Sequence, residues 1–279
     1  MIRIIADTTC GFPLQLLSDL GIDVIPQIIS FGDDSYRDDF EIDTPTFLQK
    51  LKSSATLPKT SAPPPILYHP LFSKYMLAGD TILVITPSSD VSGTYRSACM
   101  AAEEFPNADI HIFDSRTVAG GLGSLVLQAS TWAKEDMPIE ILLSNLSNLA
   151  SREKVFFVVD TLEYLHKGGR IGTAKALLGS LLQVKPILTL RDGHVDQFDK
   201  QRTSKQAINS ILKLIVDYSK SNHDPHVTIS HISAEKTALE IQKNLSDSLG
   251  INNIPILLLP PAIVVHSGPG TVSVSCFTK

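Results

Sequence analysis

The chain has 279 residues, of which 43% are hydrophobic and 19% are charged, and its formal net charge is −5 at pH 7. At roughly 150 residues per domain, this length predicts two domains, and the hydrophobic content is sufficient for two cores. The composition excludes disorder over most of the length, because disordered chains combine low hydrophobicity with high net charge. The negative charge provides no field that would attract a phosphate backbone, so we expect no nucleic-acid partner.

Neither export nor membrane insertion is indicated by the sequence. The apolar N-terminal segment reaches Asp7 too soon for the apolar region of a signal peptide. The longest apolar stretch, residues 254–265, is much shorter than the roughly 20 residues that span a bilayer. Three widely spaced cysteines without a CxxC pair are typical of free thiols in a reducing compartment. We therefore expect a cytoplasmic protein with no stable membrane insertion.

Strand-like and helix-like hydrophobic patterns alternate over the first 150 residues, which is typical of an α/β fold. The pattern predicts strands at residues 2–6, 24–31, 36–42, 81–85 and 109–113. It predicts helices at residues 13–20, 43–53, 66–77, 93–104, 118–134 and 139–151, and a proline-rich loop at 58–65. Gly32-Asp33-Asp34 indicates a hairpin between the second and third strands. The other strands lead into crossovers long enough to join parallel strands, so we expect a mainly parallel sheet.

From about residue 152 the pattern of elements changes. Strands are predicted at residues 155–159, 188–191, 195–198, 227–231, 256–259 and 272–276. A short helix precedes Gly168-Gly169, and longer helices are predicted at residues 204–220 and 234–249. Asp192-Gly193 is a strong hairpin signal. We predict two α/β domains, residues 1–153 with a mainly parallel sheet and residues 154–279 with a mixed α/β structure.

A hydroxyl-rich turn joins the predicted strand at 81–85 to the helix that begins at residue 93. Its sequence is Ser88-Ser89-Asp90-Val91-Ser92-Gly93-Thr94. The first N–H groups of a helix have no partners within the helix and lie at its positive end, so this place is suited to an anion. The alternative is that Ser92 simply caps the helix by accepting a hydrogen bond from a nearby N–H group.

Two further segments carry groups that bind anions. Thr60 and Ser61 form a hydroxyl pair that flanking prolines hold in place, although the pair also fits a plain turn between two helices. Arg170 follows Gly168-Gly169, where its guanidinium is able to hold a carboxylate or phosphate in a bidentate fork. The alternative for this second segment is a helix C-terminus whose basic residues complement the helix dipole.

His266 lies just before Gly268-Pro269-Gly270 and between two predicted strands, which places it on a tight turn where backbone approaches a ligand. The alternative is a hydrogen-bonded structural histidine. The chain has neither the GxxxxGK[ST] nucleotide loop nor the GxSxG turn of serine hydrolases. His223, His226 and His231 lack a carboxylate or thiol at matching spacing, so we expect no metal ion.

Taken in order, these motifs resemble the DegV family over the whole length of the chain. The matching segments are Ala6-Asp7-Thr8-Thr9, Thr60-Ser61-Ala62-Pro63, residues 88–95, residues 162–172, Lys185-Pro186-Ile187-Leu188 and His266-Ser267-Gly268-Pro269-Gly270. The resemblance implies a two-domain α/β protein with one fatty acid buried between the domains. Characterised members are fatty-acid-binding subunits of a bacterial fatty acid kinase. It therefore implies a long-chain fatty acid as ligand, no cofactor, and a separate kinase subunit as partner.

The resemblance also implies roles for individual residues. Thr60 and Ser92 match the positions that hold the carboxylate, and His266 matches a position near it. Arg170 and Arg202 are candidates for contact with the head group or with the kinase. Asp90 stands where the family usually has glycine. The full set expected at the carboxylate is Thr60, Ser61, Ser92, Gly93, Thr94 and His266.

Three functions are compatible with these patterns. The first, which we favour, is a lipid-binding protein without its own nucleotide site that presents a fatty acid carboxylate to a separate ATP-dependent kinase. The second is a hydrolase or acyltransferase that uses Ser92 with His266 as base, oriented by Asp7 or Asp114. The third is a regulatory module that binds an acidic or phosphorylated ligand through residues 168–170, with an affinity that falls with salt.

Overall fold

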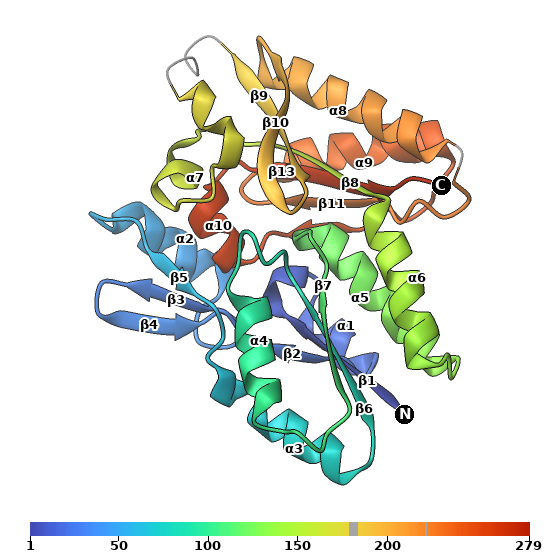
Figure 1. Cartoon of the computed structure of the whole chain (residues 1–279). Helices are drawn as coiled ribbons and strands as arrows, with labels where there is room; N and C mark the ends of the chain where they lie inside the picture. Colours follow the sequence, from blue (N-terminus) through green and yellow to red (C-terminus); the bar gives the residue numbers. More distant parts are fainter. Residues whose placement is uncertain (179–183, 221) are drawn as a thin grey trace.

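The computed structural model describes residues 1–178, 184–220 and 222–279, which form two stacked α/β units (Figure 1). The described strands of the first unit lie between residues 2 and 114, and those of the second lie between residues 153 and 277. The predicted fold class, a parallel sheet followed by a mixed one, is confirmed. The predicted division at residues 153/154 falls at the first strand of the second unit and stays a prediction.

A parallel four-stranded sheet forms the centre of the first unit. Its strands are β1 (Ile2–Asp7), β2 (Asp23–Ile25), β6 (Thr81–Thr86) and β7 (Ile110–Asp114), in the order β2-β1-β6-β7. β1 and β6 are near-continuous apolar runs because both faces of this sheet are covered by helices. Their buried carboxyl ends point towards the second unit and deliver the loops that form the site.

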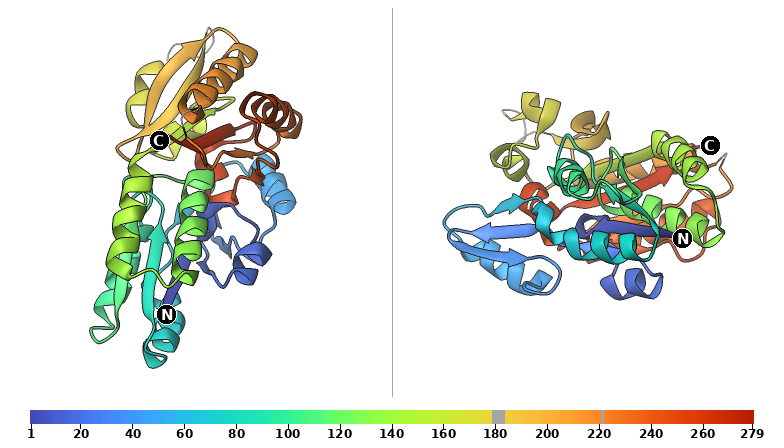
Figure 2. Two further views of the ribbon diagram at one scale, coloured as in Figure 1. Left: turned by 90° about the vertical axis from the view of Figure 1, so that its right-hand side faces the viewer. Right: turned by 60° about the horizontal axis from the view of Figure 1, so that its bottom comes forward.

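Five helices cover the two faces of this sheet: α1 (Leu14–Asp19), α3 (His69–Leu77), α4 (Thr94–Glu103), α5 (Ala119–Lys134) and α6 (Ile139–Ser151). Neighbouring strand residues point to opposite faces. Leu83 therefore packs into the cluster with α1, α5 and α6, whereas Val84 packs into the cluster with α3 and α4. Figure 2 shows α5 and α6 lying side by side. The predicted bounds of α6 are confirmed. Each predicted end of α1, α4 and α5 lies within one residue of the observed end.

A small antiparallel sheet extends from the first unit. Its order is β4-β3-β5, with β3 (Ile28–Phe31), β4 (Asp34–Arg37) and β5 (Lys59–Ser61), and α2 (Thr44–Ser53) packs beside it. The predicted hairpin is confirmed, but the strand expected at 24–31 is interrupted at residues 26–27, and the one expected at 36–42 ends at Arg37. The turn interpretation of Thr60 is wrong, because Thr60 pairs with Ile29 in this sheet.

The second unit contains a six-stranded sheet in the order β10-β9-β8-β13-β11-β12. The strands are β8 (Glu153–Val158), β9 (Lys185–Arg191), β10 (His194–Gln201), β11 (Thr228–His231), β12 (Ile256–Leu258) and β13 (Val272–Phe277). Among the described strands of this sheet, the β11–β12 pair alone is parallel. The predicted hairpin at Asp192-Gly193 is confirmed, and both residues have positive φ, as a type I′ turn requires.

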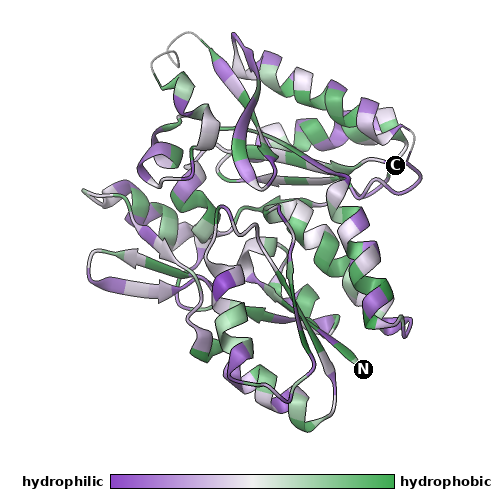
Figure 3. Cartoon of the chain, viewed as in Figure 1, coloured by the Kyte–Doolittle hydropathy of each residue, from purple (hydrophilic) through white to green (hydrophobic). Residues whose placement is uncertain are grey.

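Helices α8 (Ser204–Ser219) and α9 (Glu235–Leu249) cover one face of this sheet. The helix predicted at 204–220 is confirmed as α8 to within one residue, and its Ile211 and Ile215 are buried against the sheet. The other face looks towards the first unit and carries α7 (Glu163–Lys167) and α10 (Pro261–Ser267) at its edge (Figure 1). Hydrophobic residues concentrate on the inner strands of the two larger sheets, whereas the hairpin strands β4 and β10 are largely hydrophilic (Figure 3).

Helix α10 was not expected from the sequence. His266 was predicted to lie on a tight turn between two strands, but it lies in the last turn of α10. Pro261 occupies the first turn of this helix, where its missing N–H group costs nothing. Packing of Val264 and Val265 in the core stabilises a helix that β-branched residues do not favour on their own.

The remaining short elements are three 3₁₀ turns, η1 (Thr8–Cys10), η2 (Pro65–Leu67) and η3 (Gly172–Leu177). The first part of the helix predicted at 66–77 is therefore a 3₁₀ turn, and only the rest is α3. All three cysteines lie in the described residues and form no disulfide, as expected. No helix in the described part of the chain has the length and apolar character needed to cross a bilayer.

Candidate functional site

A cavity lies between the two units, where the loops after β1 and β6 face the second sheet. It holds about 990 Å³ of space not occupied by atoms, counting its open mouth. Most of its wall is apolar and includes Val155, Phe157 and Leu190 from β8 and β9, with Val118 and Ile263 from neighbouring segments.

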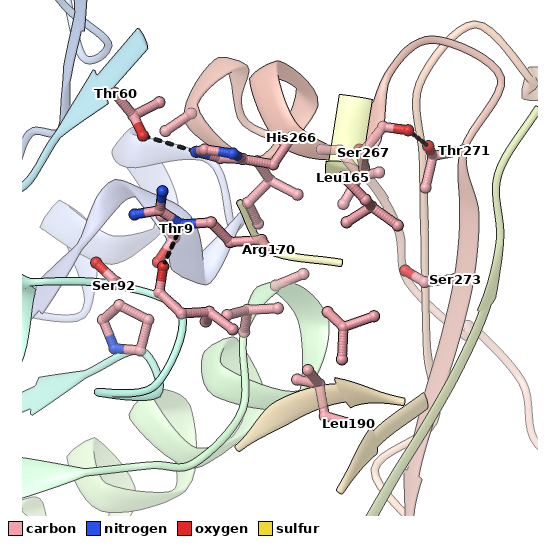
Figure 4. Close-up of a pocket in the computed structure, with 18 of the residues that line it drawn as sticks. Thr9, Thr60, Ser92, Leu165, Arg170, Leu190, His266, Ser267, Thr271 and Ser273 are labelled. Carbon is pink, nitrogen blue, oxygen red and sulfur yellow. Dashed lines mark hydrogen bonds between the residues drawn. The ribbon is translucent and has the colours of Figure 1, made fainter. Parts of the chain in front are cut away.

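One end of the cavity is polar, and four side chains from separate elements converge there (Figure 4). Thr60 comes from β5, Ser92 from the loop before α4, Arg170 from the segment after α7, and His266 from α10. The hydroxyl oxygen of Thr60 lies 2.7 Å from Nε2 of His266. Each of these four side chains is partly exposed, so this polar end is also the end that solvent reaches.

Backbone contacts hold the guanidinium of Arg170 in the cavity wall. Its Nε donates to the carbonyl oxygen of Val91 at 3.1 Å, and its Nη1 donates to that of Gly168 at 2.7 Å. The first bond ties the second unit to the loop that carries Ser92. Gly168 is the C-cap residue of α7, and His166 and Lys167 occupy its last turn, so this segment is a basic helix end as well as part of the site.

The imidazole of His266 is neutral. Burial, together with the nearby positive charge of Arg170, lowers its pKa to about 4. Its Nδ1 is buried and has no hydrogen-bond partner among the described residues. A proton on Nε2 leaves Nδ1 as the unpaired acceptor and lets His266 donate to Thr60. The hydroxyl proton of Thr60 is then available to a ligand oxygen.

A buried network of hydrogen bonds supports Ser92 from behind. The hydroxyl oxygens of Ser92 and Thr94 are 2.8 Å apart, and the side-chain amide of Gln27 donates to Thr94 at 2.8 Å and to Asp7 at 2.5 Å. Asp7 also accepts two hydrogen bonds from Thr9. Ser92 also accepts a hydrogen bond from the backbone N–H of Thr94 at 3.3 Å, as the capping interpretation expects, although the N-cap residue of α4 is Gly93 and Ser92 stands one position before it.

The structure brings together most of the residues that the sequence singled out. Thr60, Ser92, Gly93, Arg170 and His266 all line the cavity. Ser61, by contrast, is exposed, because neighbouring residues of a strand point to opposite sides. Thr94 is buried behind Ser92, and Arg202 is exposed at the end of β10, outside the cavity wall.

Sequence reasoning missed the whole apolar wall and the polar lining residues Thr9, Gln27, Thr271 and Ser273. Thr9 and Gln27 line the cavity beside Ser92. Thr9 lies in a segment that the sequence did highlight, whereas nothing local marks Gln27. On β8 the wall residues Val155 and Phe157 alternate with Phe156 and Val158, which pack beneath the helices. Two-residue periodicity therefore separated the two faces, but it did not indicate which face lines a cavity.

The hydrogen bonds do not assemble the Ser92–His266 enzyme in this arrangement. Ser92 pairs with Thr94, and Nε2 of His266 pairs with Thr60. The carboxylate of Asp7 accepts from Thr9 and Gln27, and that of Asp114 accepts from backbone N–H groups. Within the described residues, no group of three or more His, Cys, Asp or Glu side chains is placed to hold a metal ion.

Fold and cavity together define a two-domain α/β protein with a mainly apolar cavity between its domains. The family model described as uncharacterised protein, DegV family, matches residues 1–279, and the chain belongs to the DegV family. The resemblance seen in the sequence is thereby confirmed.

Known proteins similar to this chain include a DegV domain-containing protein of Clostridium perfringens. It is 31% identical over 270 residues, which cover 96% of this chain and 95% of the relative. A solved structure from Thermus thermophilus, described as fatty acid binding of a DegV family protein, is 31% identical with a TM-score of 0.90 and covers 100% and 99% of the two chains. A stearic acid-binding protein from Eubacterium ventriosum is 25% identical with a TM-score of 0.90 and the same coverage.

Proposed function

We propose that this chain binds one long-chain fatty acid in the cavity between its domains and presents the carboxylate to a separate ATP-dependent kinase. The observation that carries the proposal is the form of the cavity, in which a mainly apolar wall leads to a polar end where the hydroxyls of Thr60 and Ser92 lie with the cation of Arg170. The fatty acid described for the Thermus thermophilus relative and the stearic acid described for the Eubacterium ventriosum relative support it.

The polar end of the cavity matches the needs of a carboxylate. A buried carboxylate without partners is costly, whereas charge-assisted hydrogen bonds stabilise it. Arg170 supplies the positive charge, the hydroxyls of Thr60 and Ser92 supply donors, and the N-terminus of the ten-residue helix α4 adds the positive end of its dipole. Each methylene of the tail that is buried on the apolar wall contributes about 0.8 kcal/mol.

The exposure of the polar end supports presentation to a second protein. Thr60, Ser92 and Arg170 are partly exposed, whereas Val155 on the apolar wall is buried. A partner is thus able to reach the carboxylate while the tail stays in the cavity. In the proposed reaction, a carboxylate oxygen attacks the terminal phosphate of ATP on the partner, and the products are an acyl phosphate and ADP. Arg202, exposed and outside the cavity, is assigned to the kinase contact.

Native mass spectrometry of the purified, delipidated protein with added stearic acid tests the binding step. We expect one fatty acid per chain. The Ser92→Ala variant loses a hydrogen bond to a charged group, worth roughly 1.5–3 kcal/mol, so its affinity should fall about 10- to 100-fold. Ser61→Ala is the matched control and should bind as the wild type does, because Ser61 is exposed outside the cavity.

Failure of the wild-type protein to retain or take up any fatty acid would overturn the proposal. Presentation is tested separately, by adding a purified bacterial fatty acid kinase subunit with ATP to the loaded protein. Acyl phosphate should form only when both proteins are present, and Arg202→Ala should slow its formation without changing the affinity for stearic acid. Equal rates in the Arg202→Ala variant would remove the kinase contact from this residue.

A further inference from the structure

Two buried carboxylates lie directly behind the polar end of the cavity. Asp7 is 1% exposed and Asp38 is 9% exposed. One oxygen of Asp38 accepts hydrogen bonds from Thr8 and from the backbone N–H of Gln27, at 2.7 and 2.8 Å. The other oxygen is buried with no partner in the part of the chain that the structure describes. No described hydrogen bond or ion pair joins either carboxylate to a lysine, arginine or histidine, so both depend on neutral donors.

A continuous path of hydroxyl groups runs from Asp7 to the site. Oδ2 of Asp7 is 3.3 Å from the hydroxyl oxygen of Thr94, which is 2.8 Å from that of Ser92. Thr94 also accepts from Gln27, so its single hydroxyl proton has two possible acceptors, Asp7 and Ser92. The acceptor that receives this proton decides whether the hydroxyl of Ser92 donates a hydrogen bond towards the cavity or presents lone pairs to it.

The hydrogen bonds along this path run in opposite directions in the two protonation states of Asp7. When Asp7 is ionised, its charge attracts the proton of Thr94, and Ser92 then donates to Thr94 and presents lone pairs to the cavity. When Asp7 is protonated at Oδ2, it donates to Thr94, which donates to Ser92, which in turn donates to a ligand oxygen. Protonated Asp7 therefore favours binding of a ligand carboxylate. Ionised Asp7 disfavours it, because the Ser92 hydroxyl then donates away from the ligand and the two negative charges repel each other.

We propose that Asp7 is a positioning residue that couples fatty acid binding to the uptake of a proton, with Thr94 as the link to Ser92. This inference deepens the proposed function and rests on it. The carboxylate binds tightly when Asp7 is protonated and weakly when Asp7 is ionised.

The surroundings of Asp7 place this transition near neutral pH. Burial raises the pKa of Asp7 to about 6, opposed by its hydrogen bonds from Thr9, Gln27 and Thr94. Burial, opposed by the hydrogen bond from Thr8 and aided by the charge of Asp7, raises the pKa of Asp38 to about 7. The other titratable groups near Asp7 are Cys10 and Tyr68, whose pKa values are raised by burial and by its charge. Across the cavity lie the charged Arg170 and the neutral His266.

The test is a titration of delipidated protein with stearic acid between about pH 5.5 and pH 8.5. We expect the affinity of the wild type to fall about tenfold or more as the pH rises through this window. Calorimetry near pH 7, in two buffers with different enthalpies of ionisation, should show net proton uptake on binding. Asp7→Asn should abolish both the proton uptake and most of the pH dependence.

The pair Thr94→Val and Thr94→Ser separates the hydroxyl path from the charge of Asp7. Thr94→Val has no hydroxyl and should bind weakly, with a shallower pH dependence. Thr94→Ser restores the hydroxyl and should restore the wild-type profile. Asp38→Asn removes the neighbouring carboxylate but leaves the path from Asp7 to Ser92 intact, so it should keep the proton uptake, shifted to lower pH.

Each result bears on one of the two ideas. Wild-type protein that binds no stearic acid at any pH contradicts the proposed function. Binding with a wild-type pH profile in Asp7→Asn, or in Thr94→Val, overturns the role of Asp7 and leaves the proposed function standing. Circular dichroism shows whether each variant is folded, and if Asp7→Asn does not fold, the Thr94 pair decides.

Discussion

Asp38 illustrates, at the scale of one residue, how a site feature affects the stability of the whole chain. Its pKa in the folded protein is about 7, above the usual 3.8, because burial disfavours the charged form. Folding stability from this group is therefore present at low pH and is lost as the pH rises from about 4 through 7. We expect the free energy of unfolding, measured by urea denaturation, to be lower at pH 8 than at pH 5.

The Asp38→Asn variant should lose part of that pH dependence, by roughly 2 kcal/mol, since a raised pKa is a stability difference between the two protonation states. Asp33→Asn in the exposed hairpin turn is the matched control and should keep the wild-type slope. An Asp38→Asn protein whose stability falls between pH 5 and 8 as steeply as the wild type would contradict the assignment.

At the scale of single elements, the end of α7 fixes the ring of His266. Gly168 has ordinary helical backbone angles, so alanine is allowed there by the backbone. A Cβ atom at this position would nevertheless lie 2.3 Å from Nδ1 of His266 and 3.0 Å from the carbonyl oxygen of Tyr164. Gly168→Ala should therefore displace the ring from Thr60 and weaken fatty acid binding several-fold, with little change in melting temperature.

Titration with stearic acid checks this prediction, and Lys167→Ala is its control. Lys167 lies in the same turn but pairs only with Glu163 at the surface among the described contacts, so its removal should leave the affinity unchanged. Equal affinities for Gly168→Ala and the wild type would show that the ring does not need this glycine.

The elements that the sequence predicted are those whose signals are local. α6, α8 and the hairpin at Asp192-Gly193 carry apolar periodicity or turn residues within a few positions. β5 was missed because its three residues become a strand only by pairing with β3, which lies far back in the chain. α10 was missed because its valines favour strands, and only packing in the core makes that segment helical.

The residues of the candidate site also divide into those that a local sequence motif indicates and those that only the fold brings together. Hydroxyls and glycines in short motifs pointed to Ser92, Thr60 and Arg170. The contact between Thr60 and His266 joins residues 206 positions apart, and no pattern in the sequence measures such a distance. The apolar wall is composed of ordinary core residues, and its function depends only on the space left between the two units.

At the scale of the whole molecule, a set of contacts that we call the inter-unit latch joins the tip of the β9–β10 hairpin to the loop that carries Ser92. The hydroxyl of Ser88 donates to the carbonyl oxygen of Gly193 at 2.9 Å, and Arg116 donates to that of Asp192. Asp90 pairs with Arg116 at 2.5 Å and lies 3.2 Å from Nε2 of His194. The latch ties the second unit to the loop whose Val91 and Ser92 line the cavity.

Asp90→Gly, which introduces the residue usual in the family, should loosen the latch. Exposed ion pairs contribute about 0.2–1 kcal/mol each, so we expect fatty acid to dissociate roughly two to five times faster. Transfer of a fluorescent fatty acid from the protein to vesicles measures this rate. Asp217→Ala removes a surface pair on α8 far from the hairpin tip and should leave the rate unchanged; a similar acceleration there would discount the latch.

The position of β13 has a consequence for the time at which the protein becomes able to bind lipid. β13 lies between β8 and β11 in the centre of the sheet, and it is synthesised after every other described strand. Until residues 272–277 have left the ribosome, β8–β10 and β11–β12 are two separate ribbons, and the wall contributed by Thr271 and Ser273 does not exist. We therefore expect the pocket to form only after β13 has paired with β8 and β11, as the last step in the assembly of its wall.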